Sequence, residues 1–474
     1  LLPGQPEMTI AHESSEPSLR YAQEHIFERV SVCRDHEMLT EALRHGRGRI
    51  GHQELKTGLV LQESEGALLR DGAEYATTAS LSREREMIDC INRGIGGFEP
   101  LGNTRFIVSN RLNQEQRQAV EFVLGSRDRA VSISGAAGTG KTVTLRELHR
   151  GLQDAGKDIL ALAPTVSAVE ELKMVGFKDA MTIERLLQDP NIQAWHKVLI
   201  IDEAGMVSGR QMRELLQIAE QNPARIVFSG DTQQIQSVEA CDALRILEKE
   251  SRLRSVSLRE VKRQTAAEYR EAIQELRRNP GRGLERLQEI GAVRELPFLE
   301  RPQAIARAYL DSAAKGQDAL VVCATHDEIG RVTEAIRSER KKAGELDMGV
   351  AMSRDVSLNW TTAQKSEMQN YRSGQLLWFH RAVKGIAKNE TVEVAGIENG
   401  NLIVRNDPGR IQVISARQAK AFDVIERKSI EITSSDKLML TANCRTPGLR
   451  TAHGEIVTVS QIDSKGRIHL EDGR

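Results

Sequence analysis

A phosphate-binding loop is the feature that most constrains how this chain folds. The residues from Gly135 to Thr142 read Gly-Ala-Ala-Gly-Thr-Gly-Lys-Thr, which matches the pattern G-x-x-x-x-G-K-[ST]. A β-branched run, Ala130–Ser134, precedes the loop, and a segment with leucines at helical spacing follows it. A strand, a glycine-rich loop and a helix in this order predict an α/β fold whose loop backbone wraps around phosphate groups.

Each part of this loop has an expected role in binding a nucleotide. The glycines allow the backbone to approach the phosphates, Lys141 reaches the β and γ phosphates of ATP, and the Thr142 hydroxyl is a ligand of Mg²⁺. ATP and Mg²⁺ are therefore the expected cofactors. The residues expected to hold the nucleotide here are Gly135, Ala136, Ala137, Gly138, Thr139, Gly140, Lys141 and Thr142.

A second apolar strand ends in paired acids. Val198–Ile201 is followed by Asp202 and Glu203. Asp202, at the tip of the strand, is expected to hold Mg²⁺, usually through water. Glu203 is expected to orient or deprotonate the water that attacks the γ-phosphate.

A third strand, Arg225–Ser229, is followed by Gly-Asp-Thr-Gln-Gln. Gly230 is expected to permit close approach of the backbone. The side-chain amide of Gln234 is a candidate sensor that hydrogen-bonds the γ-phosphate and moves after hydrolysis. Lys141, Glu203 and Gln234 are thus the candidate catalytic residues in this part of the chain.

Strand and helix patterns alternate between residues 101 and 265, with Ile159–Ala163 as a further strand. This alternation predicts a parallel sheet with crossover helices. Around it we expect a loose arm at 1–20, a helical domain at 21–100, a partial second sheet domain at 266–385 and a β-rich insert at 386–474. The expected strands outside the first sheet are Ala319–Cys323, Thr391–Val394, Leu402–Val404, Ile411–Ile414, and a hairpin of Glu455–Val459 with Arg467–Leu470.

The composition says more about the cellular compartment of the protein than about its binding partner. The net charge of −1 neither indicates nor excludes a polyanion, because a basic groove can lie within a neutral total. Five widely spaced cysteines without a Cys-x-x-Cys pair predict reduced thiols in a cytosolic compartment. No apolar stretch approaches the ~20 residues of a membrane span, so no membrane insertion is expected. The start at Leu1 suggests a piece of a larger protein.

In this order the motifs resemble those of superfamily 1 DNA helicases of the 5′-to-3′ class. Leu112–Gln116 resembles the adenine-reading element of that family, which implies that Gln116 contacts the base. Pro164 and Thr165, after the second strand, resemble the motif that touches the DNA backbone. The segment 258–264 resembles the fourth motif, which implies that Arg263 contacts the γ-phosphate as a further catalytic residue.

A narrower resemblance is to the helicase region of MobF-type conjugative relaxases. It rests on Glu24–Val32, Tyr75–Thr78, Ala324–Glu328 and Tyr371–Gly374. The resemblance implies RecA-like motor domain 1A at 101–265, a partial RecA-like domain 2A and an SH3-like insert. It also implies ATP-driven 5′-to-3′ unwinding of plasmid DNA during transfer in the bacterial cytoplasm. The implied partners are single-stranded DNA or a duplex junction and the coupling components of a type IV secretion system.

Two departures from the MobF pattern limit this expectation. The sequence has no His-x-His cluster with an early nucleophilic tyrosine, so no nicking activity is expected. The last two helicase motifs, with a second γ-phosphate arginine, are expected after the insert, and the chain stops at Arg474. The chain is therefore expected to bind nucleotide better than it hydrolyses it.

Two alternatives remain open at this point. A RecD-like recombination helicase has the same architecture, and a parent protein without a nicking region favours it. A nucleotide-gated module that binds single-stranded DNA and docks onto a secretion apparatus, without productive unwinding, belongs to another class. The basic run Arg337–Lys342 fits either a DNA channel or a solvated helix face.

Overall fold

The structure, a computed structural model, describes residues 14–136, 138–189, 191–233, 240–260, 266–347, 349–406, 409–441, 444–446, 449–451 and 454–474. The chain divides into two compact units. The first unit comprises Leu1–Arg263 with Ser357–Ile425, and the second comprises Gln264–Val356 with Glu426–Arg474.

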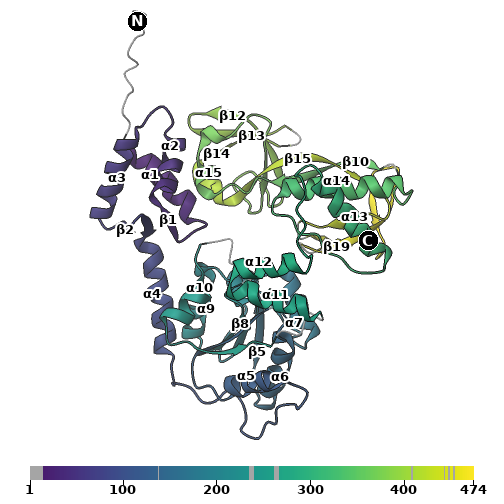
Figure 1. Cartoon of the computed structure of the whole chain (residues 1–474). Coiled ribbons are helices and arrows are strands. Elements are labelled where there is room, and N and C mark those ends of the chain that lie inside the picture. The colour runs from purple at the N-terminus through teal and green to yellow at the C-terminus, as the bar shows by residue number, and fades with distance from the viewer. Residues whose placement is uncertain are drawn as a thin grey trace, which may run out of the picture. The chain divides into compact units, whose positions relative to one another are not determined.

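The centre of the first unit is a sheet of six parallel strands in the order β6-β5-β7-β8-β4-β9 (Figure 1). Four of these strands were expected from the sequence and are confirmed. The strands are β4 (Ala130–Gly135), β5 (Ile159–Ala163), β6 (Met181–Thr182), β7 (Val198–Ile201), β8 (Arg225–Gly230) and β9 (Arg254–Leu258).

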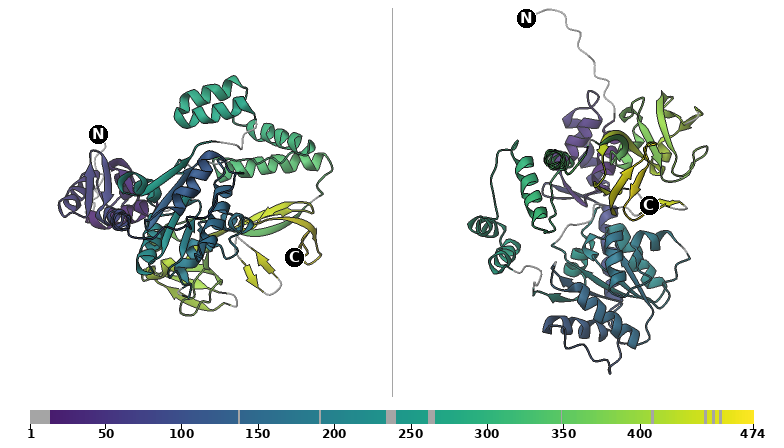
Figure 2. Two further views of the ribbon diagram at one scale, coloured as in Figure 1. Left: turned by 90° about the horizontal axis from the view of Figure 1, so that it is seen from below. Right: turned by 90° about the vertical axis from the view of Figure 1, so that its right-hand side faces the viewer.

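Helices cover both faces of this sheet. Successive side chains of a strand point to opposite faces, so each buried strand contributes to a hydrophobic core on both sides of the sheet. In β4, Ala130 packs into one core cluster and Val131 into the other. One face is covered by α5 (Gln114–Leu124), α6 (Lys141–Asp154) and α7 (Val166–Met174). The other is covered by α4 (Thr78–Arg93), α8 (Ile183–Gln188), α9 (Gly209–Gln221) and α10 (Ala243–Glu250). The expected RecA-like α/β fold is confirmed (Figure 2).

The N-terminal part of the first unit is helical, as expected, but it also contains a small antiparallel sheet in the order β1-β3-β2. Its elements are α1 (Ser15–Phe27), β1 (Val32–Arg34), α2 (Asp35–His45), α3 (His52–Ser64), β2 (Leu68–Asp71) and β3 (Glu74–Thr77). We expected a loose arm over residues 1–20. This expectation is wrong from Ser15 onward, where α1 begins. The Ser14 hydroxyl caps α1 by accepting from the Glu16 amide, and Leu19 is fully buried.

The three strands expected between residues 391 and 414 are confirmed. The antiparallel sheet that contains them also includes an earlier strand, which begins at Leu376. Its core contains Leu377, Val392 and Val404. The expected turn between β12 and β13 places Asn399 at φ 50° and Gly400 at φ 71°. The elements are α15 (Thr362–Ser366), η2 (Met368–Asn370), β11 (Leu376–Phe379), β12 (Thr391–Glu398), β13 (Asn401–Arg405), β14 (Ile411–Ile414), η3 (Ala416–Ala421) and β15 (Phe422–Ile432).

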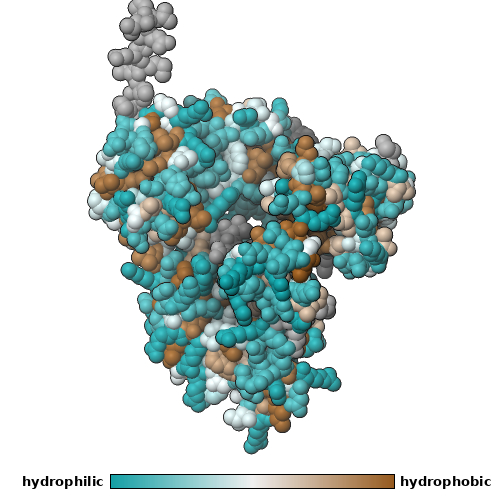
Figure 3. All heavy atoms as spheres, viewed as in Figure 1, coloured by the Kyte–Doolittle hydropathy of each residue, from teal (hydrophilic) through white to brown (hydrophobic). Residues whose placement is uncertain are grey.

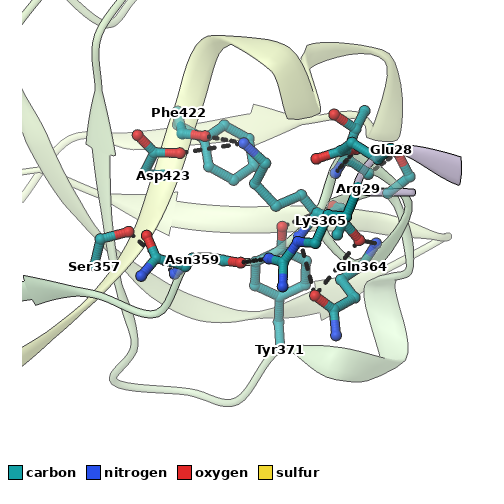
Figure 4. A network of polar contacts seen from close by, with 12 residues as sticks. Glu28, Arg29, Ser357, Asn359, Gln364, Lys365, Tyr371, Phe422 and Asp423 are labelled. Carbon is teal, nitrogen blue, oxygen red and sulfur yellow. Dashed lines mark hydrogen bonds and ion pairs between the residues drawn. The ribbon is translucent and has the colours of Figure 1, made fainter. Parts of the chain in front are cut away.

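Hydrogen bonds join this β region to the end of α1 within the first unit, as Figure 4 shows. The Thr362 amide donates to Glu28 Oε2 at 2.8 Å. The Arg29 guanidinium donates to the carbonyl of Asn359 at 2.7 Å. The start of the β region is therefore held by side chains from a segment more than 300 residues earlier.

The second unit contains four helices and antiparallel strands among its described residues. They are α11 (Ala267–Arg278), α12 (Pro280–Glu289), α13 (Arg301–Ala314), α14 (His326–Lys342), β10 (Val350–Ser357), β16 (Lys437–Met439), β17 (Cys444–Thr446), β18 (Leu449–Thr451), β19 (Ile456–Ile462) and β20 (Ile468–Leu470). The pairing of β19 with β20 confirms the expected hairpin.

The strand expected at Ala319–Cys323 is wrong, because that segment is irregular in the structure. A strand needs neighbouring strands for its backbone hydrogen bonds, and none of the described residues pairs with this segment. Its Leu320 and Val322 side chains are 89% and 83% exposed. The division at residues 100, 265 and 385, with a partial second motor domain, stays a prediction.

Hydrophilic residues cover most of the face shown in Figure 3. In the part of the chain that the structure describes, no helix is both long enough and apolar enough to cross a membrane.

Candidate nucleotide-binding site

The phosphate loop connects β4 to α6 and has a backbone that requires glycine. Gly138 and Gly140 have φ angles of 83° and 87°, a region that side chains disfavour. A Cβ atom on Gly135 would lie 2.8 Å from Thr139 Oγ1. The Thr139 hydroxyl in turn donates to the Ala136 carbonyl at 2.8 Å. Ala137 lies outside the described residues.

Lys141 and Thr142 begin α6, so they lie where the loop meets the helix N-terminus. No side chain caps this terminus, which leaves its first amides to act as donors. The Lys141 ammonium donates to the Gly135 carbonyl at 2.8 Å, and Thr142 is exposed. Backbone amides, an ammonium and the positive end of a helix dipole suit a polyphosphate, so the residues present fit ATP.

Gln116 lies against the loop from α5. Its side chain forms a capping box with Asn113 and donates to the Thr139 carbonyl at 3.2 Å. Gln116 is only 5% exposed. Its predicted contact with the adenine base stays a prediction, but the structure places it beside the loop.

Asp202 and Glu203 follow β7 at the same carboxyl edge of the sheet. Burial raises the pKa of Asp202, and hydrogen bonds from the Ser229 hydroxyl and the Glu203 amide, together with the charge of Lys141, oppose the shift. Burial also raises the pKa of Glu203, where Lys141 again lowers it. Lys141 thus acts electrostatically on both carboxyls. Glu203 has a left-handed backbone with φ 49°, a strained conformation for a residue with a side chain.

The acids and Thr142 fit a Mg²⁺ ion that is bound together with a nucleotide. Among the described residues, no group of three or more His, Cys, Asp or Glu side chains is arranged to hold a metal alone. Mg²⁺ bound with a nucleotide needs only one or two protein oxygens, because phosphates and waters supply the others. The Thr142 hydroxyl and an Asp202 carboxylate oxygen are the protein groups that would hold it.

The turn after β8 packs directly on the segment after β7. A Cβ atom on Gly230 would lie 2.9 Å from the Gly205 nitrogen, and one on Gly205 would lie 2.7 Å from the Asp231 carbonyl oxygen. The expected close backbone approach at Gly230 is confirmed. The Gln233 amide donates to Asp231 Oδ1 at 3.0 Å and closes the turn. Gln234 and Arg263 lie outside the described residues.

Thr165 follows β5 and caps α7. Its hydroxyl accepts a hydrogen bond of 3.2 Å from the Ala168 amide, and Pro164 beside it is half-buried. The contact of Pro164 and Thr165 with DNA stays a prediction.

The basic run on α14 lies in the second unit and is paired with acids. Arg337 bonds Asp436, and Lys341 lies 2.7 Å from Glu431. Arg340 and Lys342 lie 3.2 Å and 2.7 Å from Glu345 and Glu339. The charge of the run is therefore matched by nearby acids, and Arg337 is only 14% exposed, so the choice between a DNA channel and a solvated helix face stays open.

The sequence reasoning missed Ser229 as a site residue. Its hydroxyl donates to Asp202 Oδ1 at 2.8 Å and is fully buried. The sequence signal for this role was a hydroxyl side chain directly after the apolar residues of a buried strand.

Comparisons with known proteins agree with this geometry. The family model described as an AAA domain matches residues 111–297. The chain is 25% identical to the multifunctional conjugation protein TraI of Escherichia coli (strain K12), over 92% of this chain and 28% of that protein. It is 30% identical to the probable conjugal transfer protein TraA of Sinorhizobium fredii, over 38% of this chain and 17% of TraA. It is also 30% identical to the ATP-dependent RecD2 DNA helicase of Deinococcus radiodurans, over 33% of this chain and 22% of RecD2. The chain thus spans less than a third of the length of each of these relatives.

Proposed function

We propose that this chain, which is homologous to the TraI and TraA conjugative relaxase-helicases and to RecD-like superfamily 1B helicases, is an ATP-driven DNA motor. The observation that carries the proposal is the convergence of the phosphate loop with Asp202 and Glu203 at one edge of a parallel sheet. The positive charge of Lys141 lowers the pKa of both carboxyls, against the effect of burial, so the three groups belong to one site.

The chain's own residues have separate roles in hydrolysis. Lys141 exchanges its bond to the Gly135 carbonyl for the β and γ phosphates. Thr142 and Asp202 would hold Mg²⁺, which when bound would neutralise charge that develops on the phosphates. Glu203 orients the attacking water and accepts its proton, and a pKa raised by burial suits a base that works near neutral pH. Gln234 and Arg263 then respond to the γ-phosphate.

We further propose that the DNA partner is single-stranded DNA or a duplex junction, with Pro164 and Thr165 among the contacts. Unwinding runs 5′ to 3′ on plasmid DNA during conjugative transfer, in the bacterial cytoplasm, and type IV coupling components are a further partner. The extent of similarity supports conjugation over recombination, because the TraI match covers 92% of this chain and the RecD2 match covers 33%.

The test is ATP turnover by this chain with and without single-stranded DNA, with Lys141→Ala as the control. Turnover that DNA stimulates and that the substitution abolishes supports a working motor site within this chain. Nucleotide binding without stimulated turnover instead supports the nucleotide-gated binding module. No nucleotide binding contradicts both.

A further inference from the structure

The orientation of the Gln116 side chain is fixed by two backbone groups. Its Oε1 atom accepts from the Asn113 amide at 3.1 Å, and its Nε2 atom donates to the Thr139 carbonyl at 3.2 Å. A backbone amide can only donate and a carbonyl can only accept, so the two ends of the carboxamide cannot exchange places without losing both bonds. Within the described part of the chain, one N–H and one lone pair of this side chain are therefore left for a ligand.

This combination of one donor and one acceptor suits adenine better than guanine. The N7/N6 edge of adenine presents an acceptor beside a donor, whereas the N7/O6 edge of guanine presents two acceptors. A carboxamide in a fixed orientation can satisfy both groups of adenine, but its oxygen would face an acceptor of guanine. A preference for adenine therefore depends on Gln116 keeping its orientation.

The N-terminus of α5, which carries Gln116, is fastened to the segment that follows β9. Glu115 Oε2 accepts from the backbone amides of Arg259 and Glu260 at 2.8 Å and 3.1 Å. In the other direction, the Asn113 side chain donates to Glu260 Oε2 at 2.6 Å. We call these three bonds the α5 clasp. Because each side supplies an acceptor to the other, the clasp restrains both segments.

The α5 clasp connects Gln116 to the sheet edge that supports the phosphate loop. Leu258, the last residue of β9, pairs with Gly135, and a Cβ atom on Gly135 would lie 3.1 Å from Leu258 Cβ. Asn113 belongs both to the clasp and to the capping box, because its Oδ1 atom accepts from the Gln116 amide at 2.8 Å. A change in the clasp therefore reaches Gln116 through a single residue.

We propose that Glu115 and Glu260 are positioning residues that act through the α5 clasp to hold the Gln116 carboxamide in the orientation that selects adenine over guanine. This inference rests on the proposed nucleotide binding, with Gln116 as the contact to the base. The two acids act on Asn113 and on the first turn of α5, not by touching the nucleotide. Their contribution is therefore to recognition of the base, and binding of a triphosphate without a base is independent of it.

The test compares the affinities of the whole chain for non-hydrolysable analogues of ATP and GTP and for inorganic tripolyphosphate, all with Mg²⁺. The wild type should prefer the ATP analogue by about tenfold or more, the worth of the hydrogen bonds to one base edge. For Glu115→Ala we expect this preference to fall about threefold to tenfold, with tripolyphosphate affinity within about twofold of the wild type. Glu115→Gln should keep most of the preference, because its carboxamide oxygen can still accept from both amides. Glu121→Ala, at an exposed position of α5, is the matched control.

Glu260→Ala removes the acceptor of the Asn113 side chain, carries the same expectation and keeps the test decisive if Glu115→Ala fails to fold. An unchanged preference in both variants overturns the inference, and so does a wild type without a preference for the ATP analogue. An equal loss in Glu115→Gln and Glu115→Ala contradicts the role of the carboxylate as an acceptor. A parallel loss of tripolyphosphate affinity also overturns the inference, since that result indicates general damage to the phosphate loop. A wild-type chain that binds neither nucleotide contradicts the proposed function, which is a different outcome from all of these.

Discussion

The Ser229 hydroxyl donates a hydrogen bond of 2.8 Å to the Oδ1 atom of Asp202 and joins the carboxyl ends of β8 and β7. Asp202 is 9% exposed, and burial raises its pKa, so this bond is one of the few interactions that favour its charged form. A carboxylate must be charged to hold Mg²⁺. The hydroxyl of a strand residue therefore supports the metal-binding capacity of its neighbour.

Ser229→Ala is expected to weaken Mg²⁺ binding about threefold to tenfold, because it removes one hydrogen bond to a charged acceptor. The measurement is a Mg²⁺ titration at a fixed concentration of labelled nucleotide. Ser64→Ala, at an exposed position of α3, is the control. An unchanged Mg²⁺ midpoint in Ser229→Ala would show that this bond does not support the carboxylate.

Asp202→Asn is expected to raise the melting temperature of the ligand-free chain at pH 7 and to abolish the Mg²⁺ dependence of nucleotide binding. A carboxyl whose pKa is raised in the folded state destabilises the fold where it is charged, above its folded pKa. The penalty disappears below the unfolded value of about 3.9. The stability gain should therefore shrink as the pH falls towards 4. A gain that stays constant between pH 7 and pH 4 would contradict burial as its cause.

Gly230→Ala is expected to destabilise the chain by about 1–3 kcal/mol, the usual cost of overpacking. The added Cβ would lie 2.9 Å and 3.0 Å from the Gly205 and Ala204 nitrogens, and backbone cannot move aside as a flexible side chain does. Denaturant unfolding measures the effect. Gly97→Ala is the control, because a Cβ there meets nothing within 4 Å, and it should stay within about 0.5 kcal/mol of the wild type.

Glu28→Ala is expected to accelerate hydrogen exchange at the Thr362 amide by about threefold or more, because that amide loses its acceptor at 2.8 Å. Exchange measured by mass spectrometry on a peptide covering Thr362 detects the change. Glu24→Ala, an exposed acid on the same helix, should leave the rate unaltered. Equal exchange in Glu28→Ala and the wild type would mean that this contact is not maintained in solution.

The parallel sheet and its phosphate loop were predictable because their signals are local. A glycine pattern with a strand before it and a helix after it fixes β4, Gly135–Thr142 and α6 within about twenty residues of sequence. The small sheet of β1, β2 and β3 was missed. Its strands have three or four residues each, and Val32–Arg34 pairs with Glu74–Ala76 far along the chain. No period of two is visible over so few residues.

The other wrong or missed predictions also concern structure that depends on contacts between residues far apart in the sequence. Ala319–Cys323 has the composition of a buried strand, but a strand forms only beside another, and the described residues provide none. Ser229 gains its importance from Asp202, which follows a neighbouring strand 27 positions earlier in the chain. Residue types at fixed spacings predicted which groups bind phosphate, and only the packing identified the groups that hold them in place.

The most direct test of the account is equilibrium binding of a labelled ATP analogue with Mg²⁺ to the wild type, Lys141→Ala and Lys178→Ala. Lys178 is an exposed lysine on the same unit and serves as the matched control. The account predicts binding by the wild type and Lys178→Ala with affinities within about twofold. It predicts a loss of about tenfold to a hundredfold in Lys141→Ala, which removes charge-assisted bonds to phosphate. Equal affinity in all three chains, or no binding by the wild type, would contradict a nucleotide site at this loop.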